Sequence, residues 1–345
     1  MRVLVTGHLG YIGPVVVRAL KAADHDVVGL DSGLFRECAL ESSAEVPWIE
    51  RDLRDVTPDD LAGFEAIIHL AGLSNDPLGF LQPALTHDVN GAATVRLAQM
   101  AREAGVSRFL NSSSCSVYGA PEEPWVDETS PLRPVTPYGE SKAMAEHGLA
   151  QLAGPSFCVV SFRNATAFGY SPRLRTDLVV NDLASGAYLR GEIQLNSDGS
   201  AWRPLVHVRD IAEAFVLGLR APAAAINGAI LNVGAEAQNY RVIEIAQIVS
   251  AMVPGSVLTI REGASKDRRS YRTRFERIQT VLPEFSCRHD LRFGIQELVE
   301  CFARLQLKST EGLVRLAHLQ RLIAAGEVDD SLRPRVARPA GVAVA

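Results

Sequence analysis

The sequence lacks the features that mark metal-binding, nucleic-acid-binding and membrane proteins. Its five cysteines stand singly, with no C-x-x-C pair and no histidine at metal-ligand spacing, so we expect neither a metal site nor disulfides. The formal net charge is only -5, and no run of Lys and Arg favours a nucleic-acid or membrane partner. No apolar run approaches the ~18 residues of a membrane span, and no charged and then apolar leader precedes the first strand pattern. We therefore expect a cytoplasmic protein.

What is present is enough apolar material for a large α/β protein. The chain has 345 residues, 47% of them hydrophobic, and strand-length apolar runs such as RVLVTG, DVVGLD and AIIHLAG alternate with helical patterns. Continuous apolar strands separated by helices predict a doubly wound parallel sheet of the Rossmann type, covered on both faces. Later patterns are shorter and mixed. We expect a main domain over residues 1–168, a smaller mixed α/β substrate lobe over 169–307 with some return to the sheet, and a C-terminal helical extension and tail over 308–345.

The extension has its own pattern. Leu and Ile recur at helical intervals through residues 309–332, which predicts an amphipathic helix that needs a partner surface. A dimer surface and the substrate lobe are both possible partners.

A glycine-rich loop follows the first predicted strand. In VTGHLGYIG, the glycines Gly7, Gly10 and Gly13 precede a helical pattern, where tight turning and close approach of backbone to a pyrophosphate require glycine. Asp31 ends the next strand, and a carboxylate there accepts from an adenosine ribose and repels a 2′-phosphate. The loop therefore predicts NAD as cofactor, rather than NADP. We expect His8 to point away from the phosphates and assign it no role.

Two further motifs carry hydroxyl and amine chemistry. PYGESK places Tyr138 and Lys142 four residues apart, so they share one face of a helix. An ammonium beside a phenol favours the phenolate, which lets Tyr138 exchange a proton with a substrate hydroxyl. Upstream, NSSSCSVYG places several hydroxyls at the end of a predicted strand.

Together these pieces resemble the extended short-chain dehydrogenase/reductases that act on nucleotide sugars, most closely the sugar-nucleotide 4-epimerases. The matching pieces occur in family order over residues 1–300, and include TGHLGYIG, RDLRD, IIHLAGLS, SSSCSVYG, YGESK, WRPLVHVRDIA and LNVG. The resemblance implies a catalytic set of Ser114, Tyr138 and Lys142. It implies these cofactor contacts: Gly7, Gly10, Tyr11, Ile12, Gly13, Asp31, Asp52, Leu53, Leu70, Ala71, Gly72, Asn90, Ser112, Tyr138 and Lys142.

The resemblance also implies how a nucleotide diphosphate sugar is held. Arg203 and one of Arg268 and Arg269 are expected to clamp the diphosphate, because guanidinium donors match phosphate oxygens. The other expected substrate contacts are Asn75, Ser114, Tyr138, Asn164 and Thr166. Thr166 stands where the family usually has Asn, so contact at that position is a departure from the family pattern.

The choice of reaction depends on two positions after the catalytic serine. Dehydratases and decarboxylases of this family place an acid/base pair there, whereas this chain has Cys115 and Ser116. The sequence therefore favours an NAD-dependent epimerase, acting at C4 through a transient 4-keto sugar. A 4-ketoreductase or dehydrogenase, and a dinucleotide-sensing protein without turnover, remain as alternatives. The resemblance further implies a homodimer, with helices over residues 85–105 and 138–154 paired in a four-helix bundle.

Overall fold

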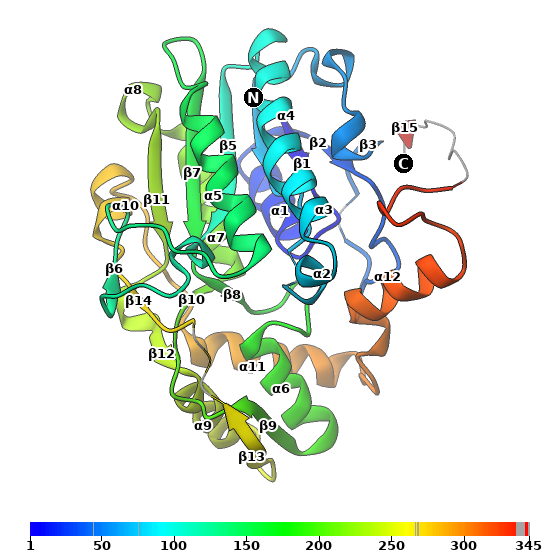
Figure 1. The fold of residues 1–345 in the computed structure, drawn as a ribbon, viewed down its shortest axis with the longest axis vertical. Helices are drawn as coiled ribbons and strands as arrows, with labels where there is room; N and C mark the ends of the chain where they lie inside the picture. The colour runs from blue at the N-terminus through cyan, green and yellow to red at the C-terminus, as the bar shows by residue number, and fades with distance from the viewer. Residues whose placement is uncertain (44, 75, 266, 268, 336–341, 344–345) are drawn as a thin grey trace.

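The computed structural model describes residues 1–43, 45–74, 76–265, 267, 269–335 and 342–343. Its centre is a sheet of order β11-β7-β5-β4-β1-β2-β3-β15, parallel except for β15. The strands of this sheet are β1 (Arg2–Thr6), β2 (Asp26–Asp31), β3 (Trp48–Glu50), β4 (Ala66–His69), β5 (Arg108–Ser114), β7 (Cys158–Asn164), β11 (Ala229–Val233) and β15 (Val342–Ala343). The predicted doubly wound fold is confirmed (Figure 1).

Helices cover both faces of this sheet. The central strands β4 and β7 are buried along their whole length, which is why their sequences are continuous apolar runs. One face packs against α1 (Gly13–Ala22), α7 (Val208–Arg220), α8 (Ala223–Ile226) and α10 (Glu276–Val281). The other packs against α4 (Ala93–Glu103) and α5 (Pro137–Ala150), and α5 also contacts α2 (Asp76–Leu81) and α3 (Pro83–His87).

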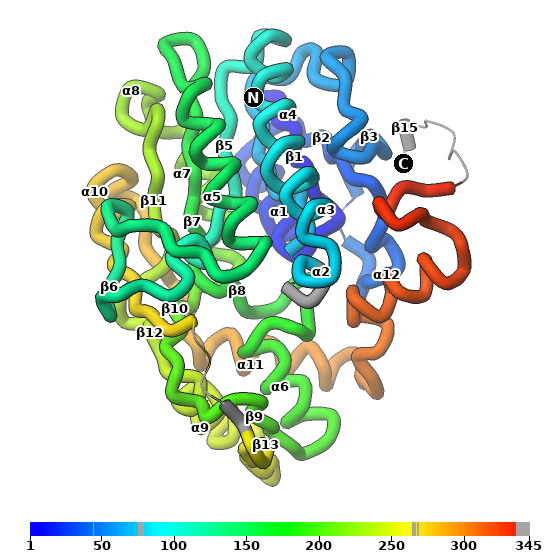
Figure 2. The backbone as a smooth tube through the Cα atoms, in the orientation of Figure 1, coloured from blue at the N-terminus to red at the C-terminus, as the bar shows by residue number. Residues whose placement is uncertain are grey.

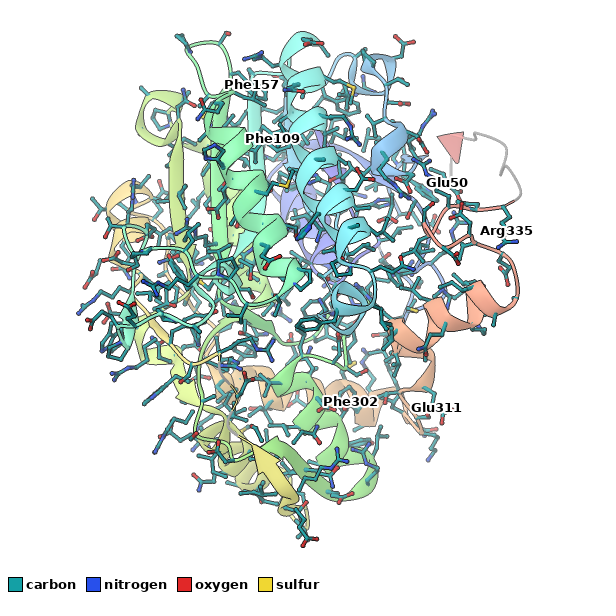
Figure 3. The ribbon with its side chains drawn as sticks, in the orientation of Figure 1. Glu50, Phe109, Phe157, Phe302, Glu311 and Arg335 are labelled. Carbon is teal, nitrogen blue, oxygen red and sulfur yellow. The ribbon has the colours of Figure 1, made fainter. Side chains whose placement is uncertain are left out.

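A second lobe with its own core lies below the carboxyl ends of the strands. Figure 3 shows Phe109 and Phe157 within the main sheet layer and Phe302 in this lobe. Its helices are α6 (Val179–Arg190), α9 (Val242–Met252) and α11 (Leu291–Arg304). Small sheets complete it: β8 (Thr166–Phe168) with β10 (Trp202–His207) and β12 (Asn239–Arg241), β9 (Glu192–Ser197) with β13 (Val257–Ser265), and β6 (Trp125–Val126) with β14 (Arg272–Thr273). Although they fall in the second segment of the sequence, α7 and β11 pack on or join the main sheet.

The C-terminal extension touches the second lobe, one of the two predicted partner surfaces, through Leu313, but most of it packs on the main domain. Its helix, α12 (Arg315–Ala324), is shorter than the predicted 309–332. Leu319 and Leu322 of α12 and the later Leu332 form an apolar cluster with Leu73, which follows β4. Figures 1 and 2 show the extension beside β2 and β3, at the edge of the sheet opposite β11. The extension therefore covers the loops that follow β2 and β4, the two strands next to β1 and its glycine loop.

The described helices include none that is both long enough and apolar enough to cross a membrane.

Candidate active site

A cavity of about 1090 Å³ opens at the carboxyl ends of the strands, between the sheet and the second lobe. The carboxyl edge of a doubly wound sheet is where such folds bind ligands. Among the predicted cofactor contacts, the cavity is lined by Gly7, Gly10, Tyr11, Ile12, Gly13, Asp31, Asp52, Leu53, Leu70, Ala71, Gly72, Ser112, Tyr138 and Lys142. Among the predicted substrate contacts, it is lined by Ser114, Asn164, Thr166, Arg203 and Arg269.

The glycine loop joins β1 to α1 at this cavity. Gly7 has φ +72°, and its N–H donates to the Leu30 carbonyl at 2.7 Å. A Cβ at Gly7 would lie 2.6 Å from the Ala71 nitrogen, so the position requires glycine. α1 begins at Gly13, and Ile12 before it has no side-chain oxygen with which to cap the first turn. Pro14 has no N–H, and Val15 donates to the Ile12 carbonyl at 3.2 Å, so in this first turn the Gly13 N–H is the donor that the described residues leave to an anion such as a pyrophosphate.

Asp31 is fixed at the end of β2 by the loops beside it. Its Oδ2 accepts from the Leu9 N–H at 3.1 Å and its Oδ1 from the Gly33 N–H at 2.9 Å. A carboxylate oxygen has two lone pairs, so each can still accept from a ribose hydroxyl. With the uncapped helix and the glycine loop, this carboxylate fits the adenosine half of NAD.

Asp52 is paired more tightly than the sequence suggests. Its carboxylate accepts from Arg54 Nε at 2.9 Å and from Nη2 at 2.7 Å. Burial alone would raise the pKa of Asp52, but the hydrogen bonds and charge of Arg54 outweigh burial and hold that pKa below its ordinary value. Arg54 Nη2 also donates to the Ser331 carbonyl of the C-terminal extension at 2.9 Å. The part of the cavity around Asp52 is thus formed jointly by the segment after β3 and the C-terminal extension.

The predicted catalytic residues meet where β5 and α5 approach each other. Lys142 Nζ donates to the Ser112 carbonyl at 2.7 Å and lies 5.8 Å from the centre of the Tyr138 ring. Burial lowers the pKa of Lys142 to about 8, against a smaller opposing effect of Glu146. Ser114 Oγ accepts from the Ser116 N–H at 3.1 Å, at the start of a 3₁₀ turn. The arrangement places a phenol, an amine and a hydroxyl around one space.

The residues after Ser114 differ in their environment. Cys115 is 2% exposed, and its Sγ donates to the Arg163 carbonyl at 3.3 Å; burial raises the pKa of this thiol to about 12. It is absent from the described cavity lining, whereas Ser116 is part of it. Cys115 is therefore a packed core residue, and this position offers the cavity no acid.

Asn164 ends β7, the strand next to β5 in the sheet, and Thr166 begins β8. Asn164 Nδ2 donates to Ser112 Oγ at 3.0 Å, while its buried Oδ1 has no hydrogen-bond partner among the described residues. Thr166 lines the cavity next to it. The Asn164 Oδ1 is thus a hydrogen-bond acceptor that the described residues leave unused in the cavity lining.

Both predicted clamp arginines that the structure describes reach the cavity, and one carboxylate joins them. Arg203 Nη2 donates to Asp267, and Arg269 donates to the same carboxylate from Nε at 3.2 Å and Nη2 at 3.1 Å. Burial lowers the pKa of Arg203, although Asp267 opposes the shift. Asn75 and Arg268 lie outside the described residues.

Three residues that the sequence singled out are committed elsewhere. Asn90 is behind the cavity: its Oδ1 accepts from the Leu73 N–H at 2.7 Å and its Nδ2 donates to the Leu73 carbonyl at 2.9 Å. It positions the loop after β4 and is missing from the described lining. The Tyr11 hydroxyl donates to the Gly169 carbonyl at 2.7 Å, although the ring lines the cavity. His8 is buried behind the glycine loop, outside the described lining.

Four arginines of the described lining were not predicted as site residues: Arg51 and Arg54, which lie in the RDLRD motif, and Arg175 and Arg315, which lie outside every motif. Arg175 donates to Asp177 from Nε at 2.9 Å and Nη2 at 2.7 Å, and to the Ser74 hydroxyl from Nη1 at 2.8 Å. Arg315, the first residue of α12, reaches the cavity from the C-terminal extension. Neither stands in a motif, and only their burial in the fold, at 9% exposed each, distinguishes them from surface arginines.

Comparison with known proteins agrees with this geometry. The sequence model of the NAD dependent epimerase/dehydratase family matches residues 3–234. A UDP-glucose 4-epimerase of Mycolicibacterium smegmatis is 35% identical over 248 residues, or 68% of this chain and 77% of that protein. One of Neisseria meningitidis serogroup C is 28% identical over 75% of this chain and 84% of that protein. The structure of MoeE5 with UDP-glucuronic acid and NAD is 28% identical, with a TM-score of 0.78 over 88% of this chain and 99% of MoeE5. The chain belongs to the NAD-dependent epimerase/dehydratase family.

Proposed function

We propose that the protein is an NAD-dependent nucleotide-sugar epimerase that acts at C4 through a transient 4-keto sugar. The observation that carries the proposal is that Ser114, Tyr138 and Lys142 line one cavity with the glycine loop. Relatives that are UDP-glucose 4-epimerases support the same activity. The burial of Cys115 outside the described lining favours epimerisation over elimination, because elimination needs a further acid/base at this place.

The chain's own groups would divide the work as follows. NAD, when bound, accepts and returns the hydride of the sugar carbon. The Tyr138 hydroxyl takes the proton of the sugar hydroxyl and gives it back, and the Ser114 hydroxyl orients the reacting oxygen. Lys142, held by the Ser112 carbonyl at 2.7 Å, supplies positive charge that favours the phenolate of Tyr138. Asp31 and the N-terminus of α1 would hold the adenosine ribose and the pyrophosphate.

The substrate is proposed to be a UDP-hexose or UDP-hexuronic acid. Arg203 and Arg269 would clamp its diphosphate, since their donors already converge on the carboxylate of Asp267. The choice of uridine as the nucleotide base rests on similar proteins: the relatives are named UDP-glucose 4-epimerases, and MoeE5 was solved with UDP-glucose and with UDP-glucuronic acid. Thr166 and the unpaired Oδ1 of Asn164 are proposed to contact the sugar.

The test is incubation of the purified protein with UDP-, dTDP-, GDP-, CDP- and ADP-sugars, followed by NMR of the sugar. We expect a C4 epimer of a UDP-sugar with no net change in NADH absorbance. Steady accumulation of NADH would instead identify a dehydrogenase. Denaturation should release stoichiometric NAD(H), whereas a protein that turns over only with added NADPH would contradict the proposal.

A pair of tyrosine variants separates catalysis from folding. Tyr138→Phe should keep its cofactor and lose at least ~100-fold in activity, because the proton acceptor is removed. Tyr188→Phe is the matched control: Tyr188 packs against Phe302 in the second lobe, away from the cavity. Equal activities of the two variants would remove Tyr138 from the mechanism.

We also propose a cytoplasmic homodimer that pairs α4 and α5 with the same helices of a second copy. The helices are closely packed, since a Cβ at Gly148 would lie 2.4 Å from Val95, and Met144 on α5 is 47% exposed. The five unpaired cysteines suit a reducing compartment. Light scattering should give twice 37.3 kDa. Met144→Glu should shift the mass toward the monomer, while Met144→Leu should not.

A further inference from the structure

Arg315 is a buried cation without a counter-ion in the part of the chain that the structure describes. Arg315 is only 9% exposed, and it lines the cavity. Its Nε and Nη2 have no hydrogen-bond partner among the described residues, and no described carboxylate forms a salt bridge with it. Burying a charge unpaired is costly, so such a group indicates that a ligand completes it.

The neighbours of Arg315 leave its charge uncompensated. Burial, and then the charge of Arg175, lowers the pKa of Arg315 to about 10, so it stays protonated at neutral pH. Asp177 opposes this shift, but its carboxylate is already bound by Arg175 at 2.7 and 2.9 Å. Asp31 opposes it more weakly, and its carboxylate already accepts from the Leu9 and Gly33 N–H groups. The guanidinium lies 5.0 Å from the centre of the Phe35 ring, which offers a π face but no acceptor. This part of the cavity therefore carries excess positive charge.

The fold places this charge over the glycine loop. Phe35, under the guanidinium, follows β2, and Ser74, which binds Arg175, follows β4. In the sheet β1 lies between β2 and β4, and its carboxyl end leads into the loop and α1. Arg315 thus lies beside loops that follow the two strands flanking β1, and it lines the same cavity as the glycine loop and Gly13.

The segment that carries Arg315 is attached to both flanking loops. We call residues 308–335 the C-terminal strap. His318 Nε2 donates to the Leu34 carbonyl at 2.9 Å after β2, and Leu319 and Leu322 pack with Leu73 after β4. Arg54, which follows β3, donates to the Ser331 carbonyl at 2.9 Å. Leu332 of the strap lines the cavity. The C-terminal strap lies beyond residue 234, where the match to the family model ends.

We propose that Arg315 binds the pyrophosphate of NAD and that the C-terminal strap thereby clasps the bound dinucleotide. The inference deepens the proposed function and rests on it. The substrate diphosphate is the less suitable ligand, because Arg203 and Arg269 are assembled for an anion from another segment of the chain. A diphosphate in this pocket would gain the charge of Arg315 together with the Gly13 N–H at the N-terminus of α1.

The test compares Arg315→Gln with Arg321→Gln. Arg321 lies on the same helix but is exposed and pairs with Glu37, so its variant controls for a changed charge on α12. Binding of ADP and of adenosine to cofactor-free protein is measured by calorimetry, and NAD retention is measured after dialysis of the holoprotein. Arg315→Gln should weaken ADP by about tenfold or more and leave adenosine unchanged, because only ADP carries the diphosphate. It should also lose NAD faster, while Arg321→Gln should match the wild type.

Each other outcome has a distinct meaning. Unchanged ADP affinity of Arg315→Gln, beside a wild type that binds ADP and retains NAD, overturns the inference and leaves the proposed function standing. Weaker binding of UDP but not of ADP also overturns it, since Arg315 would then serve the substrate. Equal loss of ADP and adenosine, with a lower melting temperature without ligand, would make Arg315 a structural residue. A wild type that binds neither ADP nor NAD contradicts the proposed function itself.

Discussion

Glu146→Gln should destabilise the protein strongly, because it removes the negative charge of a buried ion pair one helical turn from Lys142. The Glu146 and Arg163 side chains are both 3% exposed. Arg163 donates to Glu146 from Nε at 3.0 and 3.2 Å and from Nη2 at 2.7 Å. Removing one partner of such a pair leaves the other charge buried and costs about 3–5 kcal/mol. The Tyr118 hydroxyl, 3.0 Å from Arg163 Nη1, cannot replace a carboxylate.

Urea unfolding at pH 7 measures the free energy of unfolding for this variant. Glu140→Gln is the control on the same helix. Glu140 is about half exposed, and its one ion-pair partner among the described residues is His87, so this variant should lose about 0–1 kcal/mol. Replacing both partners, in Glu146→Leu with Arg163→Met, should recover most of the loss because no lone charge is left. A loss below about 1 kcal/mol in Glu146→Gln would refute the reasoning, because a true buried pair cannot be broken so cheaply.

Three further predictions concern the cofactor cavity. Lys142→Met should stabilise the cofactor-free protein by about 3 kcal/mol at pH 7, because burial lowers the Lys142 pKa from 10.5 to about 8. This penalty is present below pH 8 and disappears as pH rises toward 10.5, so the melting curves of both proteins should converge there. Asp31→Ser should raise the affinity for NADPH relative to NADH about tenfold in fluorescence titration, and an unchanged ratio would remove Asp31 from cofactor selection. Gly7→Ala should abolish NAD retention, because Gly7 has φ +72° and the added Cβ would meet the Ala71 nitrogen at 2.6 Å; retained stoichiometric NAD would show that the loop can shift.

The parts of the site that follow from local spacing could be predicted from the sequence. Tyr138 and Lys142 share a helix face because they are four residues apart, and Gly7 and Asp31 end adjacent parallel strands, so both lie at one edge of the sheet. Their meeting required only the period of a helix and the direction of a parallel sheet. The doubly wound sheet followed from the same continuous apolar runs.

The parts that were missed depend on contacts between distant segments. Arg175 meets Ser74 across 101 positions, and His318 of the strap meets Leu34 across 284. No periodicity reports such pairings. The length of the last helix was also misjudged: Gly326, with φ +70°, follows the end of α12, and the apolar Leu332 beyond it belongs to a turn that only tertiary packing makes visible.

Under the proposed function, Asp267 gives the substrate diphosphate a carboxylate to displace when it binds. The Asp267 carboxylate already accepts hydrogen bonds from Arg203 and Arg269. An incoming ligand therefore gains binding free energy from these arginines only if it pairs with them more strongly than this carboxylate does. A nucleotide diphosphate offers two phosphate groups and can displace a single carboxylate, whereas a free sugar brings no charge and leaves the arginines with Asp267. The internal carboxylate would therefore screen ligands by charge before any hydroxyl of the sugar is recognised.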